Sequence, residues 1–93
     1  MYATVRTYSA SPELAGALVG KADEVKRLIS EIAGFKAYYL VRTADGAVSV
    51  SVYEDEAGVE ESTKAAAAFI RENLPDLGGV APQVSVGEVV IDI

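Results

Sequence analysis

The chain has 93 residues, 51% of them hydrophobic, and its 8 basic and 14 acidic side chains give a formal charge of −6. That length fits one domain over residues 1–93, and the negative charge disfavours binding to the phosphate backbone of nucleic acids. The sequence has no His, Cys or Trp, and it shows neither a secretory leader nor an apolar run near the roughly 20 residues of a membrane span, so we expect a cytoplasmic protein without disulfides or membrane contact.

The first predicted elements are a strand over residues 2–9 and a helix after it. Alternating polarity and β-branched and aromatic residues indicate the strand. Ser11, followed by a proline and a glutamate, is typical of a helix N-cap. An apolar stripe with spacings of three and four then follows, and Gly34 should end the helix. Gly20 weakens this helix by up to about 1 kcal/mol, so a break near it stays open.

A β-hairpin is predicted next, with strands over residues 35–43 and 47–54. They flank Asp45-Gly46, the dipeptide that most readily forms a two-residue type I′ turn. In the register that this turn sets, the opposite residues are Val41 and Val50, Tyr39 and Val52, Arg42 and Ser49, Leu40 and Ser51, and Tyr38 and Tyr53. One face of the hairpin is therefore apolar and the other mixed.

A second helix is predicted to begin between Asp55 and Val59. It should end at Leu74, because Pro75 disfavours helical geometry in the residue before it. A loop over residues 75–82 leads to the last predicted strand.

The last strand is predicted over residues 83–93, with a β-bulge at Gly87-Glu88, where its alternation changes phase. The order βαββαβ with right-handed crossovers produces a four-stranded antiparallel sheet with two helices on one face. We therefore predict an α+β, ferredoxin-like fold whose other sheet face is open.

With the valine side of the hairpin against the helices, the open face carries polar and aromatic side chains. The candidate ligand-binding residues on it are Arg6, Tyr38, Arg42, Ser49, Ser51 and Tyr53. The tyrosines offer stacking area, and Arg42 offers a charged, planar donor group for an anionic oxygen. The same residues would also suit a polar dimer interface, and this alternative stays open.

Metal ions and cofactors are not expected. The carboxylates at residues 54–61 are clustered, but they lack the spacing of a defined oxygen cage, and solvated charges near a helix start explain them as well. Haem and transition metals would lack the His and Cys ligands that they commonly use.

Gly34-Phe35, the strand Phe-Lys-Ala-Tyr-Tyr and the run Val-Ser-Val-Ser-Val-Tyr-Glu-Asp-Glu-Ala at residues 48–57 resemble the antibiotic-biosynthesis-monooxygenase-like proteins of the dimeric α/β-barrel superfamily. The resemblance covers about residues 31–70. It implies that two ferredoxin-like subunits join their open sheet faces into a dimeric α/β barrel, and that some members oxygenate aromatic substrates without metal or flavin. Tyr53 stands where Trp is frequent in that family, and no His is present at the start of the second helix.

Two functions from different classes follow. The first is a homodimeric, cofactor-independent monooxygenase-like enzyme acting on an aromatic or hydrophobic small molecule, with a small aromatic or anionic ligand at the candidate residues. The second is a non-catalytic ligand-binding or regulatory ferredoxin-like module, because fold alone does not decide function.

Overall fold

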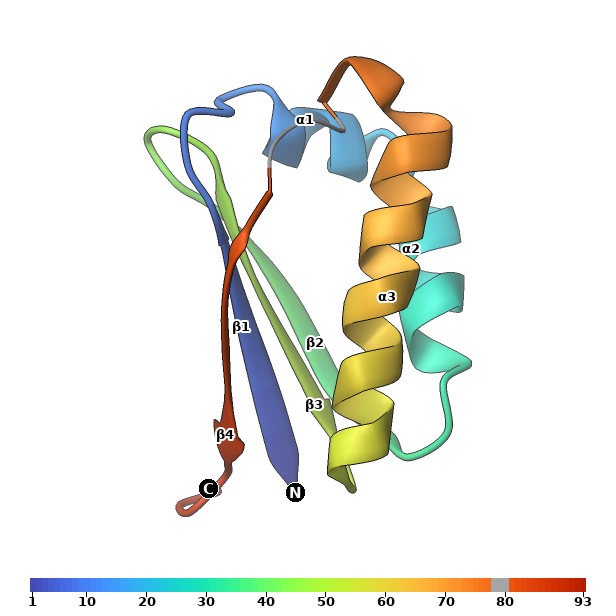
Figure 1. Ribbon diagram of the computed structural model, residues 1–93, viewed down its shortest axis with the longest axis vertical. Helices are drawn as coiled ribbons and strands as arrows, with labels where there is room; N and C mark the ends of the chain where they lie inside the picture. The colour runs from blue at the N-terminus through green and yellow to red at the C-terminus, as the bar shows by residue number, and fades with distance from the viewer. Residues whose placement is uncertain (78–80) are drawn as a thin grey trace.

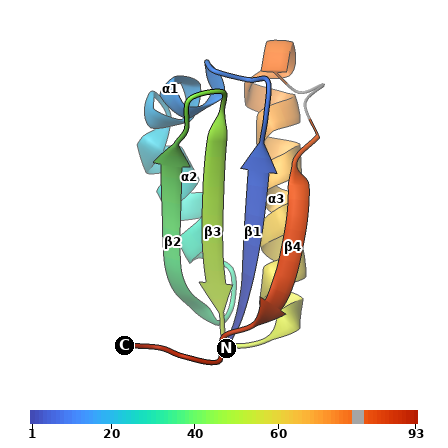
Figure 2. The same cartoon turned by 90° about the vertical axis from the view of Figure 1, so that its left-hand side faces the viewer.

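The computed structural model describes residues 1–77 and 81–93. Its elements in chain order are β1 (Tyr2–Tyr8), α1 (Leu14–Val19), α2 (Ala22–Ser30), β2 (Phe35–Arg42), β3 (Ala47–Tyr53), α3 (Glu56–Asn73), a 3-10 helix (Pro75–Leu77) and β4 (Gln83–Glu88). The strands form one antiparallel sheet in the order β2-β3-β1-β4. The helices cover one face of this sheet and leave the other open (Figure 1, Figure 2). The predicted α+β, ferredoxin-like fold is confirmed.

The first helical segment is broken at Gly20, as its sequence allowed, into α1 and α2. Ser11 is not the N-cap: α1 begins after Glu13, without a side-chain cap. The Ser11 amide instead donates to the Asp45 carbonyl (2.7 Å) at the tip of the hairpin, and this contact holds the chain away from helical geometry. Helix α2 ends before the predicted stop, and Gly34 takes a positive φ of 83° in the turn that leads into β2.

The prediction of a two-residue type I′ turn at Asp45-Gly46 is wrong. Neither central residue has the positive φ that this turn needs. Residues 43–46 form a longer loop, in which the Thr43 amide donates to the Gly46 carbonyl (3.1 Å). The observed opposite pairs are Arg42 and Ala47, Val41 and Val48, Leu40 and Ser49, Tyr39 and Val50, and Tyr38 and Ser51. The register thus differs from the prediction by two residues, which leaves each side chain on its predicted side of the hairpin because the strand repeat is two.

The side of the sheet that faces the helices was predicted wrongly. Thr4, Arg6, Ser49, Ser51 and Tyr53 are buried beneath the helices, whereas the valines lie on the open face. The physical reasons are the length of the side chains on the mixed face and the hydrogen bonds that they can form. Tyr and Arg side chains reach across the gap to the helices, and hydroxyl groups satisfy the guanidinium there, so the mixed face can be buried.

The remaining elements are close to their predicted bounds, except the last strand. Asp55 caps α3 by accepting from the Gly58 amide (3.1 Å), as expected for a helix that begins there. Strand β4 ends at Glu88, where a bulge was predicted, and residues 89–93 continue without strand pairing. The predicted loop includes residues 78–80, which lie outside the described residues. No helix in the described ranges is long and apolar enough to cross a membrane.

The tip of the hairpin packs so closely on β1 that only glycine fits there. A Cβ added to Gly46 would overlap the Tyr8 carbonyl oxygen, whereas one added to Gly87 would meet nothing within 4 Å. We expect Gly46→Ala to lower the free energy of unfolding by about 3 kcal/mol, because backbone must move to relieve the overlap. Gly87→Ala is the matched control and should change it by less than about 0.5 kcal/mol. Urea unfolding measures both, and equal midpoints for the two variants would contradict the close approach.

Candidate functional site

Arg6 lies at the centre of the sheet and is buried beneath the helices. Its strand, β1, is flanked by β3 on one side and β4 on the other. The side chain is only 1% exposed, which is unusual because arginine is rarely buried unless its charge is paired. This residue is therefore the natural starting point for the site.

Within the described residues, hydroxyl groups alone hold the guanidinium of Arg6. From β3, Ser49 Oγ accepts from Nε (3.0 Å) and Ser51 Oγ accepts from Nη2 (2.7 Å). From α3, Ser62 Oγ and Thr63 Oγ1 both accept from Nη1 (3.3 and 3.1 Å). The Ser62 hydroxyl donates its own proton to the Val59 carbonyl (2.7 Å), which leaves its oxygen turned to the arginine.

No carboxylate in residues 1–77 or 81–93 is within ion-pair distance of Arg6; the ion pair found there joins Lys36 to Glu54 (3.1 Å) on the protein surface. Hydroxyls satisfy N–H groups, but they do not cancel a charge. A buried ion costs several kcal/mol in desolvation, and most proteins offset this cost with an opposite charge. An unpaired buried cation is therefore a reason to look for a space beside it that could receive an anion.

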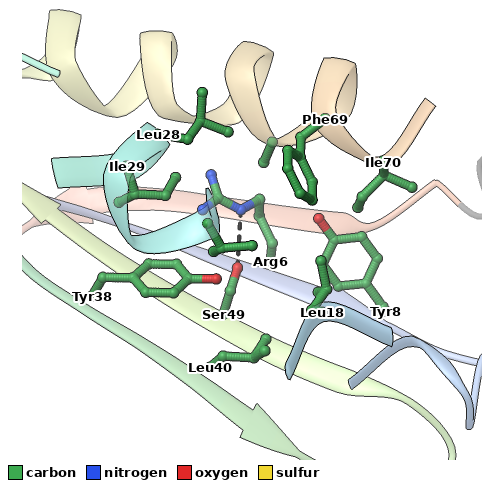
Figure 3. Close-up of a pocket in the computed structure, with 12 residues that line it drawn as sticks. Arg6, Tyr8, Leu18, Leu28, Ile29, Tyr38, Leu40, Ser49, Phe69 and Ile70 are labelled. Atoms are coloured by element: carbon green, nitrogen blue, oxygen red, sulfur yellow. Dashed lines mark hydrogen bonds between the residues drawn. The ribbon is translucent and has the colours of Figure 1, made fainter. Parts of the chain in front are cut away.

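Such a space exists beside Arg6, in the form of a small chamber between the sheet and the helices. Its volume is about 20 Å³, enough for one water-sized group. Figure 3 shows Arg6 between the tyrosines of the sheet and the apolar side chains of the helices. The walls are mainly apolar and include Leu28 from α2 and Ala66, Phe69 and Ile70 from α3.

A larger groove of about 480 Å³ adjoins this chamber, between α2 and β2. The two spaces share the side chains Leu18, Val25, Ile29, Tyr38 and Leu40. The groove adds Val19, Ala22 and Phe35 as apolar walls and Lys26 and Ser30 as polar ones. A planar apolar molecule in the groove would therefore lie next to the chamber that contains Arg6.

Two tyrosines complete the surroundings of Arg6. The hydroxyls of Tyr8 and Tyr38 point toward its guanidinium (Figure 3). Burial raises the pKa of both phenols, and the nearby charge of Arg6 opposes this rise only in part. Both are therefore neutral hydrogen-bond donors. Tyr53 has a structural role instead: its hydroxyl donates to the Ile29 carbonyl (2.9 Å), and its ring meets Phe35 edge to face.

Four of the six candidate residues from the sequence come together at this site: Arg6, Tyr38, Ser49 and Ser51. They do so under the helices and not on the open face, which corrects their predicted location. Arg42, the predicted anion-binding residue, lines neither the chamber nor the groove; it is exposed, and its Nη1 lies against Gly16 in α1.

Helix α3 contributes two residues to the site that were not predicted from the sequence. Ser62 and Thr63 carry half of the hydrogen bonds to Arg6. The signal that could have found them is two adjacent hydroxyl residues on the inner stripe of an otherwise alanine-rich helix. In the described ranges, no group of three Asp or Glu side chains is placed to hold a metal ion.

No protein-family model matches the sequence, and no curated protein matches it either. Solved structures do. A monooxygenase from the gene ActVA-Orf6 of Streptomyces coelicolor, in complex with nanaomycin D, is 25% identical with a TM-score of 0.65, covering 99% of this chain and 88% of that one. SnoaB, a cofactor-independent oxygenase from Streptomyces nogalater, is 12% identical with a TM-score of 0.65, at 99% and 95% coverage. The haem-degrading protein MhuD from Mycobacterium tuberculosis, with two haems bound in its active site, is 14% identical with a TM-score of 0.72, at 100% and 99% coverage.

These structures confirm the predicted resemblance to the antibiotic-biosynthesis-monooxygenase-like proteins at the level of fold. They also carry out different reactions, so the shared fold does not decide which reaction, if any, this chain performs.

The hydrogen bonds from Arg6 to hydroxyl groups lead to a prediction about the stability of the protein. Ser51→Ala removes the acceptor of Nη2 and leaves a charged donor buried without a partner, so we expect the free energy of unfolding to fall by about 1.5–3 kcal/mol. Ser9→Ala, at an exposed position just after β1, is the matched control and should change it by less than about 0.5 kcal/mol. Denaturant unfolding at unchanged slope measures both. A Ser51→Ala protein as stable as the wild type would mean that Arg6 does not depend on this hydroxyl.

Proposed function

We propose that this protein is a homodimeric, cofactor-independent oxygenase-like enzyme that acts on a hydrophobic aromatic molecule. The substrate lies in the groove between α2 and β2, and its anionic oxygen reaches the chamber at Arg6. The observation that carries this proposal is the buried guanidinium in the chamber beside an apolar groove, with no carboxylate partner in residues 1–77 and 81–93. The likeness to ActVA-Orf6 and SnoaB supports oxygenation as the type of reaction.

The role of Arg6 is to stabilise the substrate as an enolate or phenolate. In a site with little water, a charge-assisted hydrogen bond to such an anion contributes about 1.5–3 kcal/mol, and the field of the unpaired charge adds to it. The tyrosine hydroxyls at Tyr8 and Tyr38 can donate to the same oxygen. The apolar walls hold the rings of the substrate and exclude water from the anion.

A reaction without cofactor is balanced when the substrate supplies all the electrons. The anion of an anthrone-type substrate gives one electron to dioxygen, and the substrate radical and superoxide then combine to a hydroperoxide at the activated carbon. Loss of water from that carbon leaves a carbonyl group. A CH₂ group thus becomes C=O, one oxygen atom enters the product, the other leaves as water, and no further reductant is needed.

The alternative is a ligand-binding module without catalysis, and one observation favours it. None of the side chains that line the groove or the chamber is a carboxylate, and His is missing from the sequence, so the site holds no ordinary general base. Binding of aromatic anions without turnover is the result that would support this alternative.

Oxygen uptake tests the enzymatic proposal. With a hydroxylated anthrone as the probe, at a pH at which that compound is ionised and with a chelator present, we expect the wild type to consume oxygen and form the quinone at least about tenfold faster than the solution without protein. Arg6→Met should lose about a hundredfold of the catalysed rate, as expected for removal of one donor to a developing anion. Arg42→Met removes an arginine outside the site and should keep the rate.

Because Arg6→Met alters a buried network, its fold is checked by circular dichroism, and Tyr38→Phe serves as a second site variant with an expected loss of about tenfold. A wild-type rate equal to the background, or a folded Arg6→Met protein with the wild-type rate, would exclude this function.

The open face of the sheet supports the homodimer. Residues that lie opposite each other in neighbouring strands point to the same face of the sheet. On the open face they form three rows across β2, β3, β1 and β4. The rows are Val41, Val48, Thr7 and Gln83; Tyr39, Val50, Val5 and Ser85; and Ala37, Val52, Ala3 and Gly87. We call this surface the valine face. It carries no charged side chain, and no element in the described ranges covers it (Figure 2). An apolar sheet face of this kind favours a second copy as its partner.

Two changes test the dimer, with mass from light scattering as the measurement. The wild type should have about twice the chain mass of 9.7 kDa. Val50→Glu places a charge at the centre of the valine face and should give a folded monomer, whereas Val86→Glu, on the helix side of the exposed strand β4, should stay dimeric. Deletion of residues 89–93, whose apolar side chains are exposed, should weaken the dimer. A monomeric wild type would rule out this assembly.

A further inference from the structure

The surroundings of Arg6 contain several hydroxyl groups that can donate hydrogen bonds and, among the described residues, no carboxylate. A guanidinium has five N–H groups, and four are used by Ser49, Ser51, Ser62 and Thr63. One N–H on Nη2 therefore has no acceptor among the described residues. The hydroxyls of Tyr8 and Tyr38 point toward the same guanidinium (Figure 3), and neither is hydrogen-bonded within residues 1–77 and 81–93.

These donors stay donors at neutral pH. The pKa of Tyr8 and that of Tyr38 are raised by burial, with the charge of Arg6 acting only as the smaller, opposing cause. Neither phenol can therefore accept a proton from a bound molecule unless it first loses its own, which is disfavoured in this environment.

Proton acceptors are also missing further out. The groove and the chamber have Lys26 and Ser30 as their polar side chains besides Arg6, Ser49 and the two tyrosines. No carboxylate lines either space, and His and Cys are not in the sequence. A neutral phenol that enters the groove would therefore find no group to take its proton.

The size of the chamber adds a second restriction. A chamber of about 20 Å³ has room for a small oxygen-bearing group and not for an aromatic ring. A lone anionic oxygen attached to a ring fits this space, whereas a carboxylate would bring a second charged oxygen against apolar walls.

We propose that the site binds planar aromatic molecules that are already ionised in solution, through a single ring-bound oxyanion, and that it does not deprotonate its ligand. The ligand class is acidic enols and hydroxyquinones, and ordinary phenols are excluded at neutral pH. This inference rests on the proposed function for the location of the ligand, and it deepens that function by restricting the substrate to compounds whose own acidity supplies the anion.

Four probes with the same naphthalene-sized body test the inference by calorimetry without oxygen. They are a hydroxynaphthoquinone that is ionised at neutral pH, its O-methyl ether, a naphthol that is neutral at that pH, and a naphthoate. We expect the hydroxynaphthoquinone to bind about ten- to a hundredfold more tightly than its ether and than the naphthol, which is the range for a charge-assisted hydrogen bond. The naphthoate should bind at least about tenfold more weakly than the hydroxynaphthoquinone.

The pH dependence identifies which molecule carries the titrating group. Affinity for the naphthol should rise only as the pH approaches the pKa of the naphthol itself, and affinity for the hydroxynaphthoquinone should fall below the pKa of that compound. A base in the protein would instead give one common midpoint for both probes.

Variants of the site distinguish the effect of its charge and hydrogen bonds on ligand affinity from a general effect on the structure. Tyr38→Phe should weaken the ionised probe about tenfold and leave the ether unchanged, and Arg6→Lys, which keeps the charge but not the planar fork, should retain part of the preference for the ionised probe. Tyr39→Phe changes the neighbouring tyrosine, which is 64% exposed on the opposite side of the sheet, and should leave all four affinities as they are.

Each outcome decides between the claims. Equal affinity for the ionised probe and its ether, tight binding of the naphthol at neutral pH, or preference for the naphthoate would overturn the inference. Binding of none of the four probes would overturn both the inference and the proposed function. Ionisation-dependent binding without any oxygen uptake from a hydroxylated anthrone, measured at a pH at which that compound is ionised, would leave the inference in place and exclude the oxygenase.

Discussion

The structure depends on how one permanently charged side chain is kept inside the protein. Arg6 is bonded by hydroxyls from β3 and α3, so its guanidinium joins the centre of the sheet to the long helix above it. Those hydroxyls satisfy four of its five N–H groups and leave its charge uncompensated. The interaction that holds sheet and helix together therefore also sets the electrostatic character of the chamber beside it, and stability and recognition share the same few atoms.

The sequence was sufficient to predict the order and arrangement of the strands and helices. It was not sufficient to predict which face of the sheet the helices cover. Alternation in the hairpin separates Tyr38 and Leu40 from Tyr39 and Val41, and that separation holds in the structure. It does not say which set the helices cover. Hydrophobicity alone favours burying the valines, yet longer side chains with bonding partners fill the wider gap between layers. An apolar open face also has a use when a second copy can cover it, so the pattern is consistent with both orientations.

The candidate site was predictable in its residue types and only partly in its members. Arg6, Ser49 and Ser51 could be grouped because they share the mixed face of neighbouring strands. Arg42 belongs to that face too, but it lies at the end of its strand, where its exposed side chain meets α1 and does not line the chamber. The α3 contributions depend on the distance and rotation of a helix relative to the sheet. These depend on the packing of the whole core, which no local pattern in the sequence encodes.

The hydrogen bonds of Arg6 also bear on how the chain folds. Its partners are 43 to 57 residues away in the sequence, and β1 pairs on both sides with strands that come later in the chain. Contacts of such long range require closure of large loops before they stabilise anything, and this slows folding. During synthesis the arginine would stay hydrated until Thr63 has emerged, so desolvation of the charge is a late event. The transition state should therefore form around the local β2–β3 hairpin, with the charged centre of the protein assembled last.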